Sequence, residues 1–114
     1  MNLEDLIANG GLVPETPVKR SAIWNKKNEA GEDVELQFDV FVKKHSFGTI
    51  EKIWNDDGDR SKSAAYISQS IRLGENGKQQ LSYEQAFQLD PGLATVLIGV
   101  INEVNGTGGG DPKN

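Results

Sequence analysis

The sequence lacks cysteine altogether and contains a single histidine, His45. Disulfide bonds, thiolate nucleophiles and cysteine-based zinc sites are therefore excluded. His45 has no cluster of ligand residues beside it to complete a metal site. The serine that follows it does not make a nucleophile–base pair without a third, orienting group. These absences predict a protein that is not an enzyme and that binds neither a metal ion nor a cofactor.

Long apolar runs and an excess of basic residues are also missing. No stretch approaches the roughly 20 apolar residues of a membrane span, and residues 1–5 are acidic, unlike the start of a signal peptide. The 12 Lys and Arg residues are outnumbered by 17 Asp and Glu residues, which gives a net charge of −5. Because affinity for phosphate comes largely from Lys and Arg, we expect neither a membrane nor a nucleic acid as partner.

Two glycine-containing turns resemble ligand-binding loops, but neither has the required spacing. If Gly58 were the sixth residue of a calcium-binding loop, the first ligand position would fall on Ile53, which cannot bind calcium. A phosphate-binding loop needs four residues between its glycines, whereas Gly74 and Gly77 are separated by two. Both segments are interpreted as solvated turns.

Alternating apolar residues predict a β-hairpin over residues 18–43. One face of its second strand, residues 34–43, carries Val34, Leu36, Phe38, Val40 and Val42, a period typical of a half-buried strand. The first strand covers residues 18–25, and the polar residues 26–33 form the loop. An isolated hairpin is marginally stable. We therefore expect Leu36, Phe38 and Val40 to pack on helices that include Ile50, Trp54, Leu97 and Ile101.

Capping residues mark the helices that follow. Ser46 caps a helix that runs to about residue 55, Ser82 opens another with a capping box, and Asp90 with Pro91 opens the last one, which ends at residue 105. Residues 66–73 could form either helix or strand. The predicted class is α+β, with an N-terminal β-hairpin packed on a small set of α-helices and a long apolar C-terminal helix. We expect one domain, residues 1–106, and a flexible glycine-rich tail, residues 107–114.

Two helices carry more apolar surface than they can cover alone. A helix over residues 3–8 is too short to be stable by itself in water, so it must dock on its own domain or on a neighbour. In the last helix, Ala94 and Ile98 widen the apolar stripe beyond one face. We therefore expect self-association or partner binding through a set of apolar residues: Leu3, Leu6, Ile7, Ile98 and Val104.

Five segments follow one another in a characteristic order. They are the hairpin, the helix of residues 47–54, the turn of residues 75–78 with Leu-Ser-Tyr-Glu after it, the Leu-Asp-Pro-Gly-Leu of residues 89–93, and a final apolar helix that closes at residues 102–106. In this order the chain resembles the tail assembly chaperones of lambdoid long-tailed bacteriophages over most of its length. It departs from them at residues 80–82, which read Gln-Leu-Ser where Pro-Leu-Phe is usual.

The resemblance implies a function in the cytoplasm of the host cell. Such proteins are needed while the tail is built and are absent from the mature virion. They are thought to coat the tape measure protein and keep it soluble until tail tube protein replaces them, which suits a homo-oligomer arranged as a ring or spiral. The resemblance also implies a longer, frameshifted form of the same protein as a partner. Two alternatives remain open, an acidic phage-encoded inhibitor that mimics nucleic acid and a minor virion structural protein.

A frameshift position can be named from the residues near the end of the sequence. Asp111, Pro112 and Lys113 can be encoded by codons in which two adjacent codons re-pair one base earlier, so Pro112 and Lys113 are the expected site. A slip there would leave the folded domain intact and attach a second segment through a flexible linker. An ordinary disordered tail is the equally weighted alternative.

Overall fold

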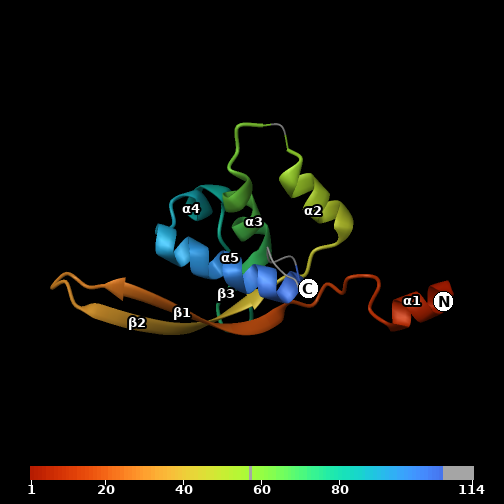
Figure 1. Ribbon diagram of the computed structural model, residues 1–114, viewed down its shortest axis with the longest axis horizontal. Helices are drawn as coiled ribbons and strands as arrows, with labels where there is room; N and C mark the ends of the chain where they lie inside the picture. Colours follow the sequence, from red (N-terminus) through yellow and green to blue (C-terminus); the bar gives the residue numbers. More distant parts are fainter. Residues whose placement is uncertain (57, 107–114) are drawn as a thin grey trace.

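The computed structural model describes residues 1–56 and 58–106, and in that part of the chain helices and strands build an α+β fold (Figure 1). In chain order the elements are α1 (Leu3–Ala8), β1 (Val18–Lys27), β2 (Asp33–Val42), α2 (Phe47–Trp54), α3 (Lys62–Ser70), β3 (Ile71–Leu73), β4 (Gln79–Gln80), α4 (Tyr83–Phe87) and α5 (Pro91–Asn105). The predicted α+β class is confirmed. The proposed frameshift position, Pro112 and Lys113, and the tail of residues 107–114 lie outside the described residues.

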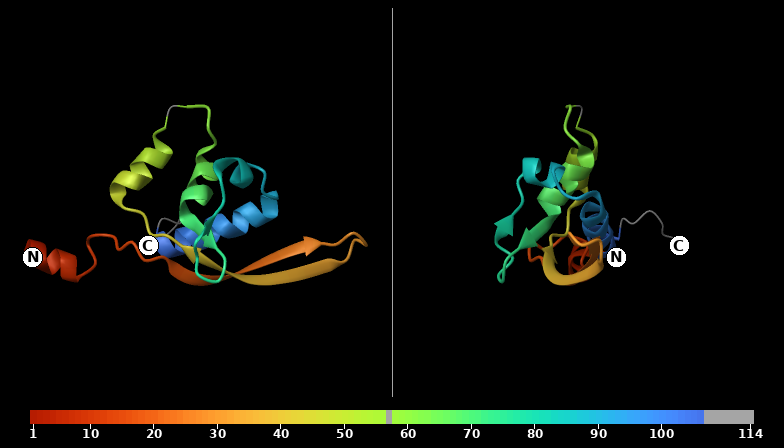
Figure 2. Two further views of the ribbon diagram at one scale, coloured as in Figure 1. Left: turned by 180° about the vertical axis from the view of Figure 1, so that it is seen from behind. Right: turned by 90° about the vertical axis from the view of Figure 1, so that its left-hand side faces the viewer.

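The strands form one antiparallel sheet in the order β1-β2-β3-β4. The views from the front and from behind agree that α2, α3, α4 and α5 lie on one side of it (Figures 1 and 2). α5 covers β1 and β2, and α3 packs on α5, α4 and α2. The core therefore lies between the sheet, α3 and α5, where Val40, Val42 and Ile101 are 0% exposed.

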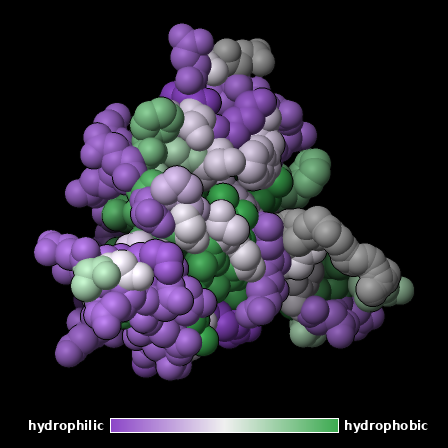
Figure 3. Space-filling view, turned by 60° about the vertical axis from the view of Figure 1, so that its left-hand side comes forward, coloured by the Kyte–Doolittle hydropathy of each residue, from purple (hydrophilic) through white to green (hydrophobic). Residues whose placement is uncertain are grey.

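The sheet is longer than the helical layer that covers it. Along β2, Val40 is fully buried, Phe38 is half-buried and Leu36 is 41% exposed. Seen from the hairpin end, apolar surface lies between the hydrophilic hairpin loop and the helices (Figure 3). The prediction that Leu36 packs in the core is wrong, because the N-terminal end of α5 does not reach as far along the sheet as the hairpin loop. That part of the sheet face is left without a covering helix.

The remaining predicted contacts of the hairpin divide between two helices. Leu97 and Ile101 on α5 are buried in the same core cluster as Val40. α2 packs mainly on α3, and Trp54 contacts Tyr66 of α3 with ring centroids 5.2 Å apart. Trp54 itself remains 38% exposed. Ile50 of the same helix packs against the core cluster that contains Val40 and Val42.

The ambiguous segment, residues 66–73, is both helix and strand. α3 continues to Ser70, and β3 begins at Ile71 with no turn between them. The Ser70 hydroxyl donates to the backbone oxygen of Tyr66, one turn earlier, and Ile71 is fully buried where it pairs with Val42 of β2. Ser70 bonds to its own helix, whereas Ile71 is β-branched and lies in the sheet. This explains why the sequence of this segment is compatible with both helix and strand.

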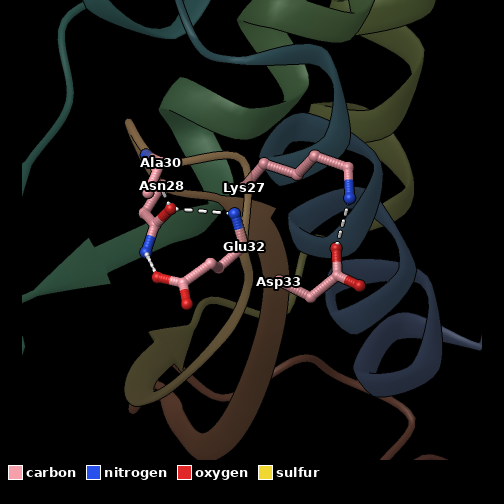
Figure 4. Close-up of polar contacts among 5 residues, drawn as sticks. All are labelled: Lys27, Asn28, Ala30, Glu32 and Asp33. Atoms are coloured by element: carbon pink, nitrogen blue, oxygen red, sulfur yellow. Dashed lines mark hydrogen bonds and ion pairs between the residues drawn. The ribbon is translucent and has the colours of Figure 1, made fainter.

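The hairpin loop is shorter than predicted. β1 and β2 pair from Val18 opposite Val42 to Lys27 opposite Asp33, so only residues 28–32 remain as loop. The Asn28 side-chain oxygen accepts from the backbone nitrogens of Ala30 and Glu32, both at 2.9 Å, and Lys27 Nζ lies 2.6 Å from Asp33 Oδ1 (Figure 4). These local contacts hold the loop in shape where no helix covers it.

α1 stands away from the rest of the molecule. Asn2 and Asp5 form a capping box at its start, and none of its residues is buried. It lies at the end of the molecule opposite the hairpin loop (Figures 1 and 2). The molecule is consequently elongated, with extents of 60 × 32 × 31 Å.

Candidate partner-binding surface

His45 lies between β2 and α2, and as the single histidine it is the first candidate for a catalytic base. Its Nε2 is 2.6 Å from Ser70 Oγ, which resembles a base beside a nucleophile. Ser70, however, is 0% exposed and its hydroxyl donates to the Tyr66 backbone oxygen. A substrate cannot reach this oxygen, so the pair is interpreted as a structural hydrogen bond.

The surroundings of His45 oppose its charged form. Burial lowers the pKa of His45 below its ordinary value, and the positive charges of Lys43 and Arg72 lower it further. Since Ser70 already donates its proton to Tyr66, Nε2 of the neutral imidazole is the donor to Ser70 Oγ. The neutral ring therefore serves as a fixed hydrogen-bond donor between the sheet and α3.

An apolar groove opens between α3, α4 and α5. Its floor carries one alanine from each helix, Ala64, Ala86 and Ala94. Because alanine side chains are short, three packed helices leave a hollow of about 190 Å³ between them. The longer side chains of Ile67, Leu89 and Ile98 line its sides, together with Ser61 and Ser63. A hollow of this kind can receive apolar side chains from a partner helix.

Phe87 stands at the rim of this groove and is 64% exposed. It lies at the end of α4, where its ring stacks on Tyr83 with centroids 6.0 Å apart. Tyr83 is held by the backbone nitrogen of Ser61, which donates to its hydroxyl at 2.7 Å, and by the Arg60 guanidinium 4.2 Å above its ring. A large apolar side chain is thus presented to solvent on a fixed support. Exposed aromatic anchors of this type dominate many protein interfaces.

The structure distributes the five predicted surface residues over three places. Ile98 lines the groove. Val104 lies in the last turn of α5, partly buried against the core. Leu3, Leu6 and Ile7 lie on α1, where they are 67%, 39% and 49% exposed. The structure therefore does not bring the five into one surface.

Sequence reasoning missed Phe87 and two of the three alanines of the groove, Ala64 and Ala86. A groove between three helices depends on how those helices are placed, which one-dimensional periodicity does not encode. One signal was present, because Phe87 is a large apolar residue in a short helix whose neighbours Glu84, Gln85 and Gln88 are polar.

Two further hollows among the described residues are more polar. One is about 400 Å³ and is lined by Lys43, Lys44, Ser46 and Glu15 among others, and Ser46 and Thr49 already bond each other there at 3.1 Å. Within residues 1–56 and 58–106, no three His, Cys, Asp or Glu residues are grouped so that they could hold a metal ion. None of the helices in these residues has the length and apolar character needed to cross a membrane.

Comparison with known proteins gives one match. A protein-family model described as "Phage tail assembly chaperone, TAC" matches residues 4–105, which covers nearly the whole described fold. No curated protein and no solved structure matches the chain. The matched range includes α1, the hairpin and all three helices of the apolar groove.

Proposed function

Because this chain belongs to the phage tail assembly chaperones, we propose that it is a non-enzymatic chaperone that binds the tape measure protein and keeps it soluble during tail assembly. The observation that carries this proposal is the apolar groove between α3, α4 and α5 with Phe87 exposed at its rim. Family membership also favours this function over a nucleic-acid mimic or a minor virion protein.

A tape measure protein is a suitable ligand for such a groove. A long, largely helical chain with an apolar stripe presents side chains at successive turns, and these fit a hollow lined by aliphatic residues. The floor of Ala64, Ala86 and Ala94 admits larger side chains from the partner, while Phe87 covers them from the rim. Removing apolar surface from water is the driving force, and no covalent chemistry is required.

The remaining parts of the proposal follow from the family resemblance. The chaperone acts in the host cytoplasm, is displaced by tail tube protein and is absent from the mature virion. Several copies coat one tape measure protein, together with a longer frameshifted form that extends beyond Pro112 and Lys113. The gene sequence tests the last point, since codons that cannot re-pair in the −1 frame would rule out a slip at this position.

A binding measurement with two matched variants tests the groove. Phe87→Asp places a charge at the rim of the groove, whereas Phe47→Asp places the same charge on α2, where Phe47 is 82% exposed and lies in none of the lining described above. Both residues are exposed, so neither change should unfold the protein. We expect Phe87→Asp to weaken binding to a tape measure fragment at least about tenfold and Phe47→Asp to leave it unchanged.

Salt provides a second criterion for the same complex. Apolar contact is not screened by ions, whereas attraction between exposed charges is. Binding should therefore change little between about 50 and about 200 mM salt. Equal loss of binding in both variants, or binding abolished by the higher salt, would show that the groove is not the contact.

A further inference from the structure

One end of the hairpin carries apolar side chains that the helices leave partly or largely exposed. We call this the distal sheet face and define it as Trp24, Lys26, Val34 and Leu36, which lie on the same side of the sheet as buried Val40. Trp24 is paired with Leu36 and Lys26 with Val34, and opposite residues in an antiparallel pair point to the same side. Leu36 is 41% exposed, whereas Ala22, two residues before Trp24, is 2% exposed.

The N-terminal end of α5 lies where the distal sheet face begins. A Cβ atom at Gly92, in the first turn of α5, would lie 3.8 Å from Trp24 Nε1, and Glu103 near its other end pairs with Arg20 at 3.6 Å. Beyond Trp24 the strand runs on for three residues, to Lys27. At about 3.3 Å per residue this bare stretch is about 10 Å long. The layer of helices on the sheet therefore lacks one short helix.

α1 has the properties of the missing helix. Leu3, Leu6 and Ile7 lie at positions that share one helix face, and all three are exposed. Six residues span about 9 Å, which matches the bare stretch. A six-residue helix is not stable alone in water, so its apolar face needs a surface to cover it.

The charges of the two surfaces are complementary. On the side of the hairpin that faces the helices, the charged residues are Arg20 and Lys26, both basic. Lys26 lies over Trp24, with Nζ 5.0 Å from the ring centroid. The charged side chains of α1 are Glu4 and Asp5, both acidic, and Glu4 borders the face made by Leu3 and Ile7. A docked α1 would place Glu4 toward Lys26.

We propose that α1 of one copy docks on the distal sheet face of the next copy. The two surfaces lie at opposite ends of a molecule 60 Å long (Figures 1 and 2), so a second copy meets α1 more readily than the hairpin of the same chain does. The contact joins two different surfaces, and contacts of that kind repeat from copy to copy. This inference rests on the proposed function, since it names how copies would be linked along the tape measure protein.

The contact is small, and its size fixes what should be observed. A six-residue helix on four side chains falls well below the roughly 1,200 Å² of a stable interface. Free copies should therefore associate weakly and reversibly, and more strongly as concentration rises. Copies aligned on one filament would associate further, because the second contact becomes intramolecular.

Sedimentation velocity of the full chain across a range of concentration tests the proposal without the tape measure protein. Two variants place a charge in the contact, Ile7→Glu on α1 and Leu36→Glu on the distal sheet face. Two matched controls place it elsewhere, Leu12→Glu outside α1, where Leu12 is 60% exposed, and Ile23→Glu on the opposite side of the hairpin, where Ile23 is 47% exposed. Circular dichroism shows whether each variant keeps the native fold.

We expect Ile7→Glu and Leu36→Glu each to weaken self-association at least about tenfold, and both controls to resemble the wild type. A mixture of the two contact variants should form heterodimers and nothing larger, since only one intact pair of surfaces remains. Four results would each overturn the proposal: a wild type that stays monomeric, controls that weaken association equally, an effect of Ile7→Glu alone, or an effect of Leu36→Glu alone. Because this assay contains no tape measure protein, its failure leaves the groove and its Phe87 test untouched.

Discussion

His45 and Asn105 join the last turn of α5 to the end of the sheet. The His45 backbone nitrogen donates to Asn105 Oδ1 at 2.8 Å, and Asn105 Nδ2 donates to the Lys43 backbone oxygen at 3.3 Å. The His45 ring adds the bond to Ser70 at the end of α3. Three elements that are far apart in sequence are thereby held by hydrogen bonds between buried or half-buried groups, each costly to break without replacement.

The neutral state of His45 predicts how stability depends on pH. Its folded pKa lies below the ordinary value of 6.5 because of burial, Lys43 and Arg72, so the unfolded chain takes up the proton first. The contribution of His45 is then complete above about pH 6.5 and is lost as pH falls from there through the lower folded pKa.

Urea unfolding at about pH 7.5 and about pH 5.5 should show this loss in the wild type. His45→Gln keeps an N–H donor near Ser70 but does not titrate, and it should lose less stability over the same interval. Identical losses in the two proteins would mean that His45 does not cause the acid sensitivity.

Gly77 is required by a positive φ and by a close neighbour. Its φ is +66°, and a Cβ atom there would lie 2.6 Å from Phe41 Cγ. Gly31 in the hairpin loop has a φ of +81° but nothing within 4 Å. Alanine at either position carries the left-handed backbone cost of about 1–2 kcal/mol, and at position 77 it must also displace the Phe41 ring, which costs about 1–3 kcal/mol more.

Chemical denaturation of Gly77→Ala and Gly31→Ala separates the two contributions. We expect Gly77→Ala to lower the free energy of unfolding by at least about 1 kcal/mol more than Gly31→Ala does. Equal effects would show that the turn can shift away from Phe41.

At the scale of elements, the hairpin is the part that the sequence predicts best. The period of two locates both strands and the loop, because each residue's side of the sheet follows from its position. The extent of burial does not follow from this period, since it depends on how far the N-terminal end of α5 reaches over β1. Ala22 and Leu36 lie on the same side of the sheet, yet one is 2% and the other 41% exposed.

Truncation of two valines on β2 tests how burial decreases along the strand toward the hairpin loop. Val40 is 0% exposed beneath α5, and Val34 is half-buried near the loop. Val40→Ala removes two buried methyl groups at about 0.8 kcal/mol each and leaves a cavity, so its cost should be about 1.6 kcal/mol or more. We expect Val34→Ala to cost less than half as much. Equal losses in urea unfolding would place the whole strand face in the core.

The groove shows a second limit of sequence reasoning. Ile98 was found because it widens the apolar stripe of its helix, a property of one element. Ala64 and Ala86 were not found, because a small residue marks a hollow only when larger neighbours surround it. Tyr83, Arg60 and Ser61 hold Phe87 in position through contacts across 22 and 23 residues of chain, and no local pattern reveals such contacts.

At the scale of the whole molecule, the two proposals use three separate apolar surfaces: the groove, the distal sheet face and α1. An elongated shape of 60 × 32 × 31 Å keeps these surfaces apart, so the two proposed contacts would not exclude each other on one copy. The net charge of −5 adds repulsion between free copies, which ions screen. This division suits a protein that assembles on its partner more strongly than on itself.

The central claim is that the groove keeps the tape measure protein soluble, and co-expression tests it most directly. The tape measure protein is produced with the wild type, with Phe87→Asp, with Phe47→Asp or alone, and its soluble fraction is measured after centrifugation. We predict a soluble tape measure protein with the wild type and with Phe47→Asp, and a largely insoluble one with Phe87→Asp or alone. A soluble fraction that is the same with and without the wild-type chaperone would contradict the account.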